Sequence, residues 1–136
     1  MITQKYINDL AYRIVGCAIE VHRQLGPGLL ESVYEVCLIE ELLQAGLQVR
    51  SQVVIPISYK GKDLGGTLRM DILVEDIIIV ELKAVETMIP LFQAQLLSYL
   101  KLAEKPKGLL INFNCENITQ NLIPLVTEQF AALQRE

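Results

Sequence analysis

Two charged side chains interrupt an apolar stretch that otherwise has the composition of a buried strand. Residues 77–80 are Ile-Ile-Ile-Val, and Glu81 and Lys83 follow with Leu82 between them. Residues two apart on a strand point to the same face of a sheet, so Glu81 and Lys83 share a face that Leu82 does not. Charged groups on a central strand are costly unless they are paired, hydrogen-bonded or bound to metal. Taken alone, the pair is most simply interpreted as a buried salt bridge.

A third charged residue, Asp71, changes that interpretation because it lies on the preceding expected strand. If the two strands are antiparallel, a three-residue loop after Val74 pairs this residue with Ile78 and places Asp71 directly opposite Glu81. A two-residue turn would put the two carboxylates on opposite faces of the sheet. We predict the three-residue loop, and a register with Asp71 opposite Val80 would contradict a shared site.

Two carboxylates in one place would constitute a site for a hard cation. Each carboxylate repels the other and raises its pKa, and a divalent cation with oxygen ligands relieves that repulsion. Asp71 and Glu81 therefore predict a Mg²⁺ or Mn²⁺ site, to which the backbone carbonyl oxygen of Leu82 is a further candidate ligand. The nearby Lys83 ammonium group could stabilise a metal-bound hydroxide or the charge on a phosphoryl group.

The elements that must position these residues follow from the apolar periodicity, which changes between 3.6 and 2 along the chain. We expect helices over 3–25, 29–45 and 90–102, strands over 52–59, 66–74, 77–85 and 108–113, and a terminal helix from residue 124. Pro56 favours an edge position for the first strand, and Pro90 suits the first turn of a helix. This order predicts an α/β fold in which helices flank a mixed sheet.

Composition limits the kinds of protein that this chain can be. Its 136 residues, 51% hydrophobic and 21% charged, suit one packed domain over residues 1–136. A net charge of −4 argues against sequence-independent coating of DNA, which needs a basic surface. Three cysteines without a CxxC pair predict neither a disulfide framework nor a zinc knuckle, and we find no membrane span or secretion signal. We therefore expect a cytoplasmic protein that does not bind membranes.

Several of these residues lie in motifs of a known superfamily. Asp71, followed ten residues later by Glu-x-Lys on the next strand of a meander, resembles the PD-(D/E)XK nuclease superfamily. Residues 28–34 (GLLESVY) match GxxExxY, the signature after which the small GxxExxY protein family of that superfamily is named. Residues 69–86 and 108–114 also look like that family, and the resemblance extends from about residue 7 to 126. It implies a restriction-endonuclease-like core of helix, three strands, helix and strand.

The resemblance also implies roles for single residues. Asp71 and Glu81 would be metal ligands, and Lys83 would be the catalytic lysine. Glu31 matches an acidic residue that this superfamily adds to the metal site from the helix before the sheet. The alternative role of Glu31 is to stabilise its helix, because a carboxylate is favourable near a helix N-terminus. Tyr34, the last residue of the signature, is more typical of a core aromatic residue.

Gln95 and Tyr99 form a QxxxY pattern that resembles a motif on the helix after the catalytic strand in RecB-like members of the superfamily. The resemblance implies that Gln95 approaches the site and orients Lys83 or the substrate, and that Tyr99 contacts phosphate. A spacing of four puts both residues on one helix face. The alternative is a half-buried pair that packs on the sheet.

Two groups of lysines are candidates for contact with a phosphate backbone. Lys60 and Lys62 lie in an expected turn, and Lys101 lies near Lys105 and Lys107 after the QxxxY motif. Among these we select Lys101, with Tyr99, as a substrate-binding residue. The alternative for all of these lysines is a solvated surface.

Together these features predict a metal-dependent nuclease that hydrolyses phosphodiester bonds in nucleic acid, with DNA rather than RNA as the expected substrate. The main alternative is a non-catalytic module of the same fold that binds nucleic acid or a protein partner. A homodimer is also possible, because Val126, Phe130 and Leu133 would form an apolar stripe on the expected terminal helix.

Overall fold

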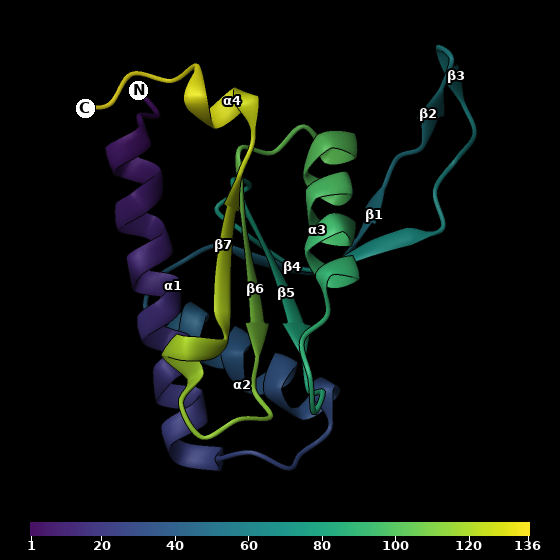
Figure 1. Ribbon diagram of the computed structural model, residues 1–136. Coiled ribbons are helices and arrows are strands. Elements are labelled where there is room, and N and C mark those ends of the chain that lie inside the picture. Colours follow the sequence, from purple (N-terminus) through teal and green to yellow (C-terminus); the bar gives the residue numbers. More distant parts are fainter.

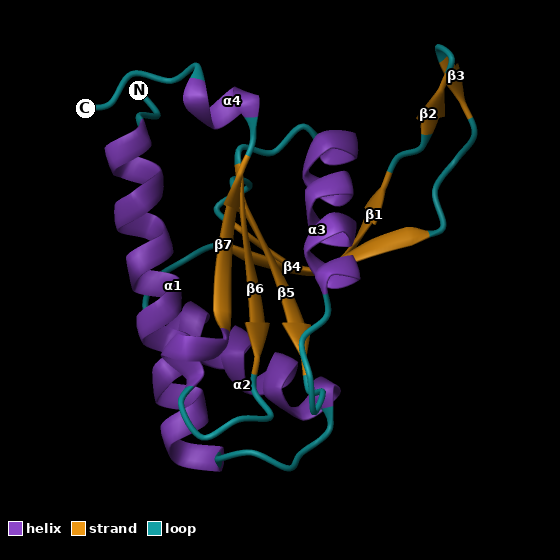
Figure 2. Ribbon diagram, in the orientation of Figure 1, coloured by secondary structure: helices purple, strands orange, loops and turns teal.

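A five-stranded mixed sheet lies at the centre of the computed structural model, which describes residues 1–136 (Figures 1 and 2). Two helices, α1 and α2, cover one face of the sheet, and α3 covers the other. The elements in chain order are α1 (Gln4–Leu25), α2 (Glu31–Gln44), β1 (Val49–Ile55), β2 (Ser58–Tyr59), β3 (Lys62–Asp63), β4 (Leu68–Val74), β5 (Ile78–Lys83), α3 (Pro90–Ala103), β6 (Lys107–Asn112), a 3₁₀ helix (Ile118–Asn121), β7 (Leu122–Val126) and α4 (Glu128–Ala131).

The strand order in the sheet is β1-β4-β5-β6-β7. Strands β1, β4 and β5 form an antiparallel meander, and the chain then crosses over through α3 to β6, which is parallel to β5. Strand β7 returns antiparallel to β6. This arrangement confirms the predicted α/β fold, with its three-stranded meander, helix and strand in a mixed sheet.

The two faces of the sheet bury different amounts of apolar surface. A cluster of 20 buried residues joins α1 and α2 to one face, whereas 8 buried residues join α3 to the other. Helix α1 presents Ile7, Leu10 and Ile14 to the larger cluster, and the Thr3 hydroxyl caps its first turn by accepting the Tyr6 N–H. No helix in the structure is both long enough and apolar enough to cross a membrane.

The strand expected over residues 52–59 is two separate elements, so that prediction is wrong in its extent. Strand β1 ends at Ile55, and Pro56 interrupts the ladder because proline has no N–H to donate. Residues Ser58 and Tyr59 instead pair with β3 in a small separate hairpin. As expected from the position of Pro56, β1 is an edge strand.

The expected terminal helix is also wrong over most of its length. Strand β7 extends to Val126, and Pro124 is tolerated there because β7 is an edge strand. Only the four residues of α4 are helical, and Phe130 and Leu133 pack against the larger core cluster. Val126 is 47% exposed, so the three residues do not form one apolar stripe on a shared helix face.

Candidate active site

The register of β4 against β5 brings two acidic residues opposite each other. Ile72 pairs with Val80, so the next residues in the same register, Asp71 and Glu81, face each other across the two strands. The predicted three-residue loop between the strands is confirmed, because Val74 pairs with its expected partner on β5. The sheet therefore brings both carboxyl groups to one place.

The two carboxyl groups take the place of the backbone ladder at this point. The Asp71 N–H donates to Glu81 Oε1 over 2.9 Å, and the Leu82 N–H donates to Asp71 Oδ2 over 2.9 Å. No backbone N–H donates to Asp71 Oδ1 or Glu81 Oε2, and neither oxygen is buried without a partner. Each carboxyl group therefore has one oxygen fixed by the backbone and one that no backbone group holds.

The environment of Glu81 strongly perturbs its carboxyl group. Its side chain is buried on a central strand, with the residue only 7% exposed. Burial first, and then the Asp71 carboxylate, raise the pKa of Glu81 to about 9. At neutral pH this carboxyl group therefore retains its proton unless a nearby positive charge stabilises its ionised form.

Lys83 lies on the same strand face, at the end of β5, and its ammonium group contacts an aromatic ring. Its Nζ lies 4.5 Å from the centre of the Phe92 ring, within the range of a cation–π interaction. No carboxylate lies within 4.0 Å of this Nζ, so the simplest interpretation of the sequence, a buried salt bridge with Glu81, is wrong. The Lys83 side chain instead extends toward α3, where its ammonium group lies over the Phe92 ring.

The chain beyond Lys83 is held by a buried amide. The Asn112 side chain, 1% exposed, accepts the Val85 N–H over 3.1 Å and donates to the Val85 carbonyl over 2.9 Å. The Phe113 N–H donates to the Lys83 carbonyl over 2.9 Å. These bonds fix the end of β5 and the start of the segment that leads to α3. The sequence contained one signal for them, an Asn directly after the apolar residues Leu109, Leu110 and Ile111.

The GxxExxY segment acts as a structural unit at the start of α2. Tyr34 is fully buried, its hydroxyl donates to the Gly26 carbonyl over 2.6 Å, and its ring stacks on Phe113 with centroids 4.7 Å apart. Gly28 has φ of 100°, which glycine adopts readily. These contacts fix the α1–α2 loop, so that α2 begins at Glu31. Tyr34 is thus a core residue, as expected.

Helix α2 brings two carboxyl groups into electrostatic range of Asp71. Although Glu31 is exposed overall, partial desolvation and then the Asp71 carboxylate raise the pKa of its carboxyl group. Burial raises the pKa of Glu35, one turn later, and its hydrogen bond with Gln52 opposes that shift. Sequence reasoning missed Glu35, although the spacing of four from Glu31 places both on one helix face.

The QxxxY pair lies on the α3 side of the site. Gln95 Nε2 donates to the Tyr99 hydroxyl over 3.0 Å. Burial and then the Glu81 carboxylate raise the pKa of Tyr99, which therefore lies within electrostatic range of the acidic pair. Gln95 itself is exposed and bonds to Tyr99 rather than to Lys83.

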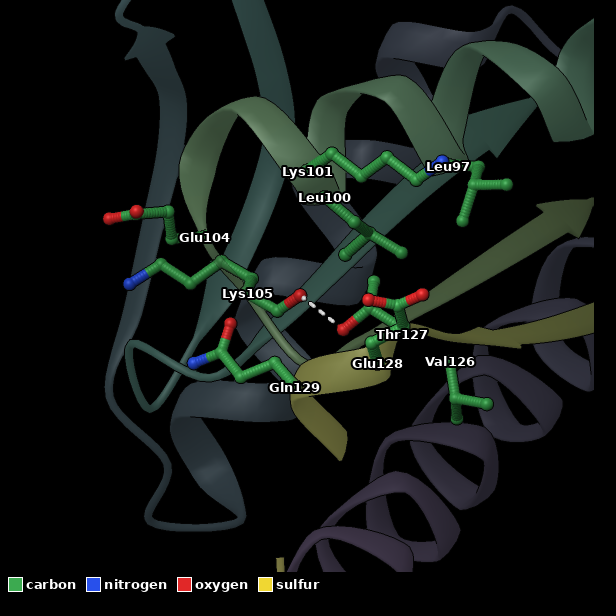
Figure 3. Close-up of a pocket in the computed structure, with 9 residues that line it drawn as sticks. All are labelled: Leu97, Leu100, Lys101, Glu104, Lys105, Val126, Thr127, Glu128 and Gln129. Atoms are coloured by element: carbon green, nitrogen blue, oxygen red, sulfur yellow. Dashed lines mark hydrogen bonds between the residues drawn. The ribbon is translucent and has the colours of Figure 1, made fainter. Parts of the chain in front are cut away.

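The structure does not bring Lys101 to this site. Lys101 lies nine residues after Phe92 on α3, about 14 Å farther along the helix. It lines a surface cavity of about 500 Å³ between the C-terminal end of α3 and residues 126–129 (Figure 3). This cavity lies away from the acidic pair, so we do not assign Lys101 to the substrate.

The carboxyl oxygens of Asp71 and Glu81 suit a divalent cation, although Glu31 does not converge with them on one point. No three His, Cys, Asp or Glu side chains lie close enough together to hold a metal ion. The free oxygens of Asp71 and Glu81 are hard donors of the kind that Mg²⁺ and Mn²⁺ prefer. Two adjacent carboxyl groups, one with a strongly raised pKa, therefore fit such an ion chemically. Glu31, which lies within electrostatic range of Asp71, is the predicted third ligand.

Comparison with known proteins identifies the family. The family model for the PD-(D/E)XK nuclease superfamily matches residues 8–123. Searches of curated proteins and of solved structures gave no match. Proteins of this superfamily are generally nucleases and typically use divalent metals. Since the match covers most of the chain and the fold is the one expected, the chain belongs to the PD-(D/E)XK nuclease superfamily.

Proposed function

We propose that this protein is a metal-dependent nuclease, with residues 1–136 acting as one domain, Mg²⁺ or Mn²⁺ as cofactor and DNA rather than RNA as the preferred substrate. The observation that carries the proposal is the position of Asp71 opposite Glu81, with Lys83 on the same strand face. The GxxExxY and QxxxY patterns support placing the protein in the GxxExxY family and the RecB-like branch.

The metal would be held by oxygen atoms that have no other role in the fold. Asp71 Oδ1 and Glu81 Oε2 accept no backbone N–H, and the Leu82 carbonyl and Glu31 are the further candidate ligands. When bound, a divalent cation would polarise the phosphoryl group and lower the pKa of a coordinated water molecule. The positive charge would also allow Glu81 to ionise at neutral pH.

The residues around the acidic pair would then act on the substrate directly. The Lys83 ammonium group would donate to the attacking water or to a phosphate oxygen, where negative charge develops. Gln95 already donates to the Tyr99 hydroxyl oxygen, which leaves the Tyr99 O–H to donate to a phosphate oxygen. Phe92 would keep Lys83 on the α3 side of the acidic pair, in position for this contact with substrate.

Cleavage of DNA by a Lys83 variant tests this proposal. We expect purified protein with Mg²⁺ or Mn²⁺ to cleave single-stranded, duplex or branched DNA, with lower rates on matched RNA. Lys83→Ala should lower the rate by a factor of about 10²–10³, whereas Lys101→Ala, at the other end of α3, should retain activity. Cleavage that persists in Lys83→Ala would contradict the assignment of Lys83.

Calorimetry distinguishes this enzyme from a non-catalytic module of the same fold. We expect the protein to bind Mn²⁺ at millimolar or lower concentrations, and Asp71→Asn to weaken that binding. Absence of Mn²⁺ binding at millimolar concentrations would instead support a module that only binds nucleic acid or protein.

A further inference from the structure

The segment between β1 and β4 forms a hairpin that stands clear of the rest of the molecule (Figure 1). We call residues 56–67, which include β2 and β3, the arm. Only Ile57 is even partly buried, and every other residue of the arm is exposed. The arm therefore contributes almost nothing to either core cluster.

The arm is nevertheless ordered by its own backbone. Lys60 and Gly61 have φ of 51° and 77°, the paired positive values of the tight turn that matches strand twist. The Ile57 N–H donates to the Gly65 carbonyl over 2.8 Å, and the Leu64 N–H donates to the Ile57 carbonyl over 2.9 Å. Because its backbone is already ordered, the arm would lose little conformational entropy when it binds a ligand, and its exposed surface is available for contact.

The arm and the strand residues on either side of it form one of two basic segments of the chain. Residues 51–70 carry Lys60, Lys62 and Arg69 against Asp63, a net charge of +2, so the other nine basic and fifteen acidic residues carry −6. The Asp63 carboxylate accepts the Gly65 N–H within the arm. Neither Lys60 nor Lys62 forms an ion pair, so both charges are available to an external anion.

The other basic segment of the chain is less available. Residues 101–107 also carry a net charge of +2, but Lys105 pairs with Asp76 over 3.0 Å. Lys107 donates to Asn8 over 3.0 Å and lies over the Phe130 ring. Only Lys101 remains free there, at the end of α3 remote from Phe92. An anionic polymer at the acidic pair therefore finds its free cations on the arm.

The arm is connected to the acidic pair by β4 itself. Asp71 lies three residues after Leu68, the first residue of β4 and the base of the arm, or about 10 Å along the strand. Lys62 lies at most about 30 Å from Asp71, the length of nine extended residues. At about 3.4 Å per base pair, this reach corresponds to about nine base pairs.

We propose that the arm binds the phosphate backbone of nucleic acid beside the active site, with Lys60 and Lys62 contacting phosphates. Tyr59, which is 61% exposed and lies beneath the Lys60 ammonium group at 5.5 Å, packs against a sugar or base. The inference rests on the proposed function only in that the substrate is nucleic acid.

The test measures binding separately from cleavage, by fluorescence anisotropy in a Lys83→Ala background. The arm variant Lys60→Gln/Lys62→Gln is compared with Lys101→Gln/Arg135→Gln, which removes two exposed, unpaired charges elsewhere. On a duplex of about 20 base pairs, the arm variant should lose about 1.8 from the slope of log affinity against log salt, about 0.9 for each phosphate contact. On the same duplex, the control variant should lose little of this slope.

Each other result has a defined meaning. Equal losses in the arm variant and its charge-matched control would show that only net charge matters and would overturn the proposal. If the arm variant binds the duplex as well as the Lys83→Ala protein does, the arm proposal fails while the nuclease proposal stands. If neither the Lys83→Ala protein nor the unmodified protein binds nucleic acid, both proposals fail.

Discussion

From Ile72 to Val74, β4 pairs with β5 through backbone hydrogen bonds and buried apolar side chains, whereas one residue earlier the carboxyl groups of Asp71 and Glu81 replace the ladder. The apolar half supplies burial, which for each large aliphatic side chain is worth about 1.5–3 kcal/mol. The charged half works against folding, because burial and repulsion raise the pKa of Glu81. The difference shows how one strand pair can hold costly groups in register: the paired half fixes the positions that the charged half occupies.

A cavity in the apolar half should destabilise the protein most. Ile79→Ala removes a fully buried side chain beneath α3 and should lower the free energy of unfolding by about 2–5 kcal/mol. Cleavage per folded molecule should change little, because Ile79 has no polar group to bind metal or substrate and only packs in the cluster that includes Tyr99. Urea unfolding and rate measurements on the same preparation check this. A loss of activity larger than the loss of folded protein would show that the two halves are not separable.

Neutralising Glu81 should raise the free energy of unfolding, whereas Ile79→Ala should lower it. Because Glu81 has a pKa of about 9 in the fold and an ordinary value of 4.5, the folded state binds its proton more tightly than the unfolded chain. Stability should therefore fall as pH rises from about 4.5 to about 9. Glu81→Gln should remove this slope and stabilise the metal-free protein at pH 8 by at least about 1.4 kcal/mol, the value of one pKa unit.

Thermal unfolding across this pH range measures that effect, with the exposed residue Glu86→Gln as the matched control. Added Mn²⁺ should flatten the slope in the unmodified protein, because a bound cation favours the ionised Glu81. An unchanged slope in Glu81→Gln would mean that Glu81 does not limit stability.

The contact between Lys83 and Phe92 should have a smaller effect, confined to activity. Phe92→Leu removes a cation–π interaction worth about 0.5–2 kcal/mol, so cleavage should fall by a factor of about 2–30. Phe92→Tyr keeps the aromatic face and should retain most of the rate. The signal of a ¹³C-methylated Lys83 should move when the ring is removed and stay near its position in Phe92→Tyr. If Leu and Tyr behave alike, the ring face does not position Lys83.

The part-buried Gln95–Tyr99 hydrogen bond should contribute least. Gln95→Met removes one donor worth about 0.5 kcal/mol, and the KM for DNA should rise by a factor of about 2 without a change in stability. Tyr99→Phe should raise KM at least as much if the hydroxyl contacts phosphate. A loss of kcat in Gln95→Met without a change in KM would indicate that Gln95 acts on Lys83 instead.

The fold and the register of the acidic pair could be predicted because both depend on periodicity. The switch from a spacing of 3.6 to a spacing of 2 located the helices and the meander, and the parity of the loop after Val74 decided which face Asp71 occupies. Pro56 and Pro124 were less decisive, because proline is compatible with strand ends, turns and edge strands alike. Consequently the split after β1 and the strand β7 were not predicted.

The partners of the site residues could not be predicted because they come from distant parts of the chain. Phe92, Asn112 and Glu35 each lie on a different element, and their contacts depend on how α3, β6 and α2 pack on the sheet. Lys101 was assigned to the substrate from its charge and its closeness in sequence to Tyr99, but a helix places residues two apart on different sides. Distance along a helix separates it from Lys83.

The backbone amides that point at the acidic pair give the site a built-in spectroscopic reporter. The Asp71 and Leu82 N–H groups each donate to a carboxyl oxygen of the pair. A cation that draws electron density from these carboxylates weakens both hydrogen bonds at once, so the two amide resonances should shift together during a metal titration. Two signals from adjacent strands, read in one NMR spectrum, would thus follow occupancy of the site without a substrate or a label on any side chain.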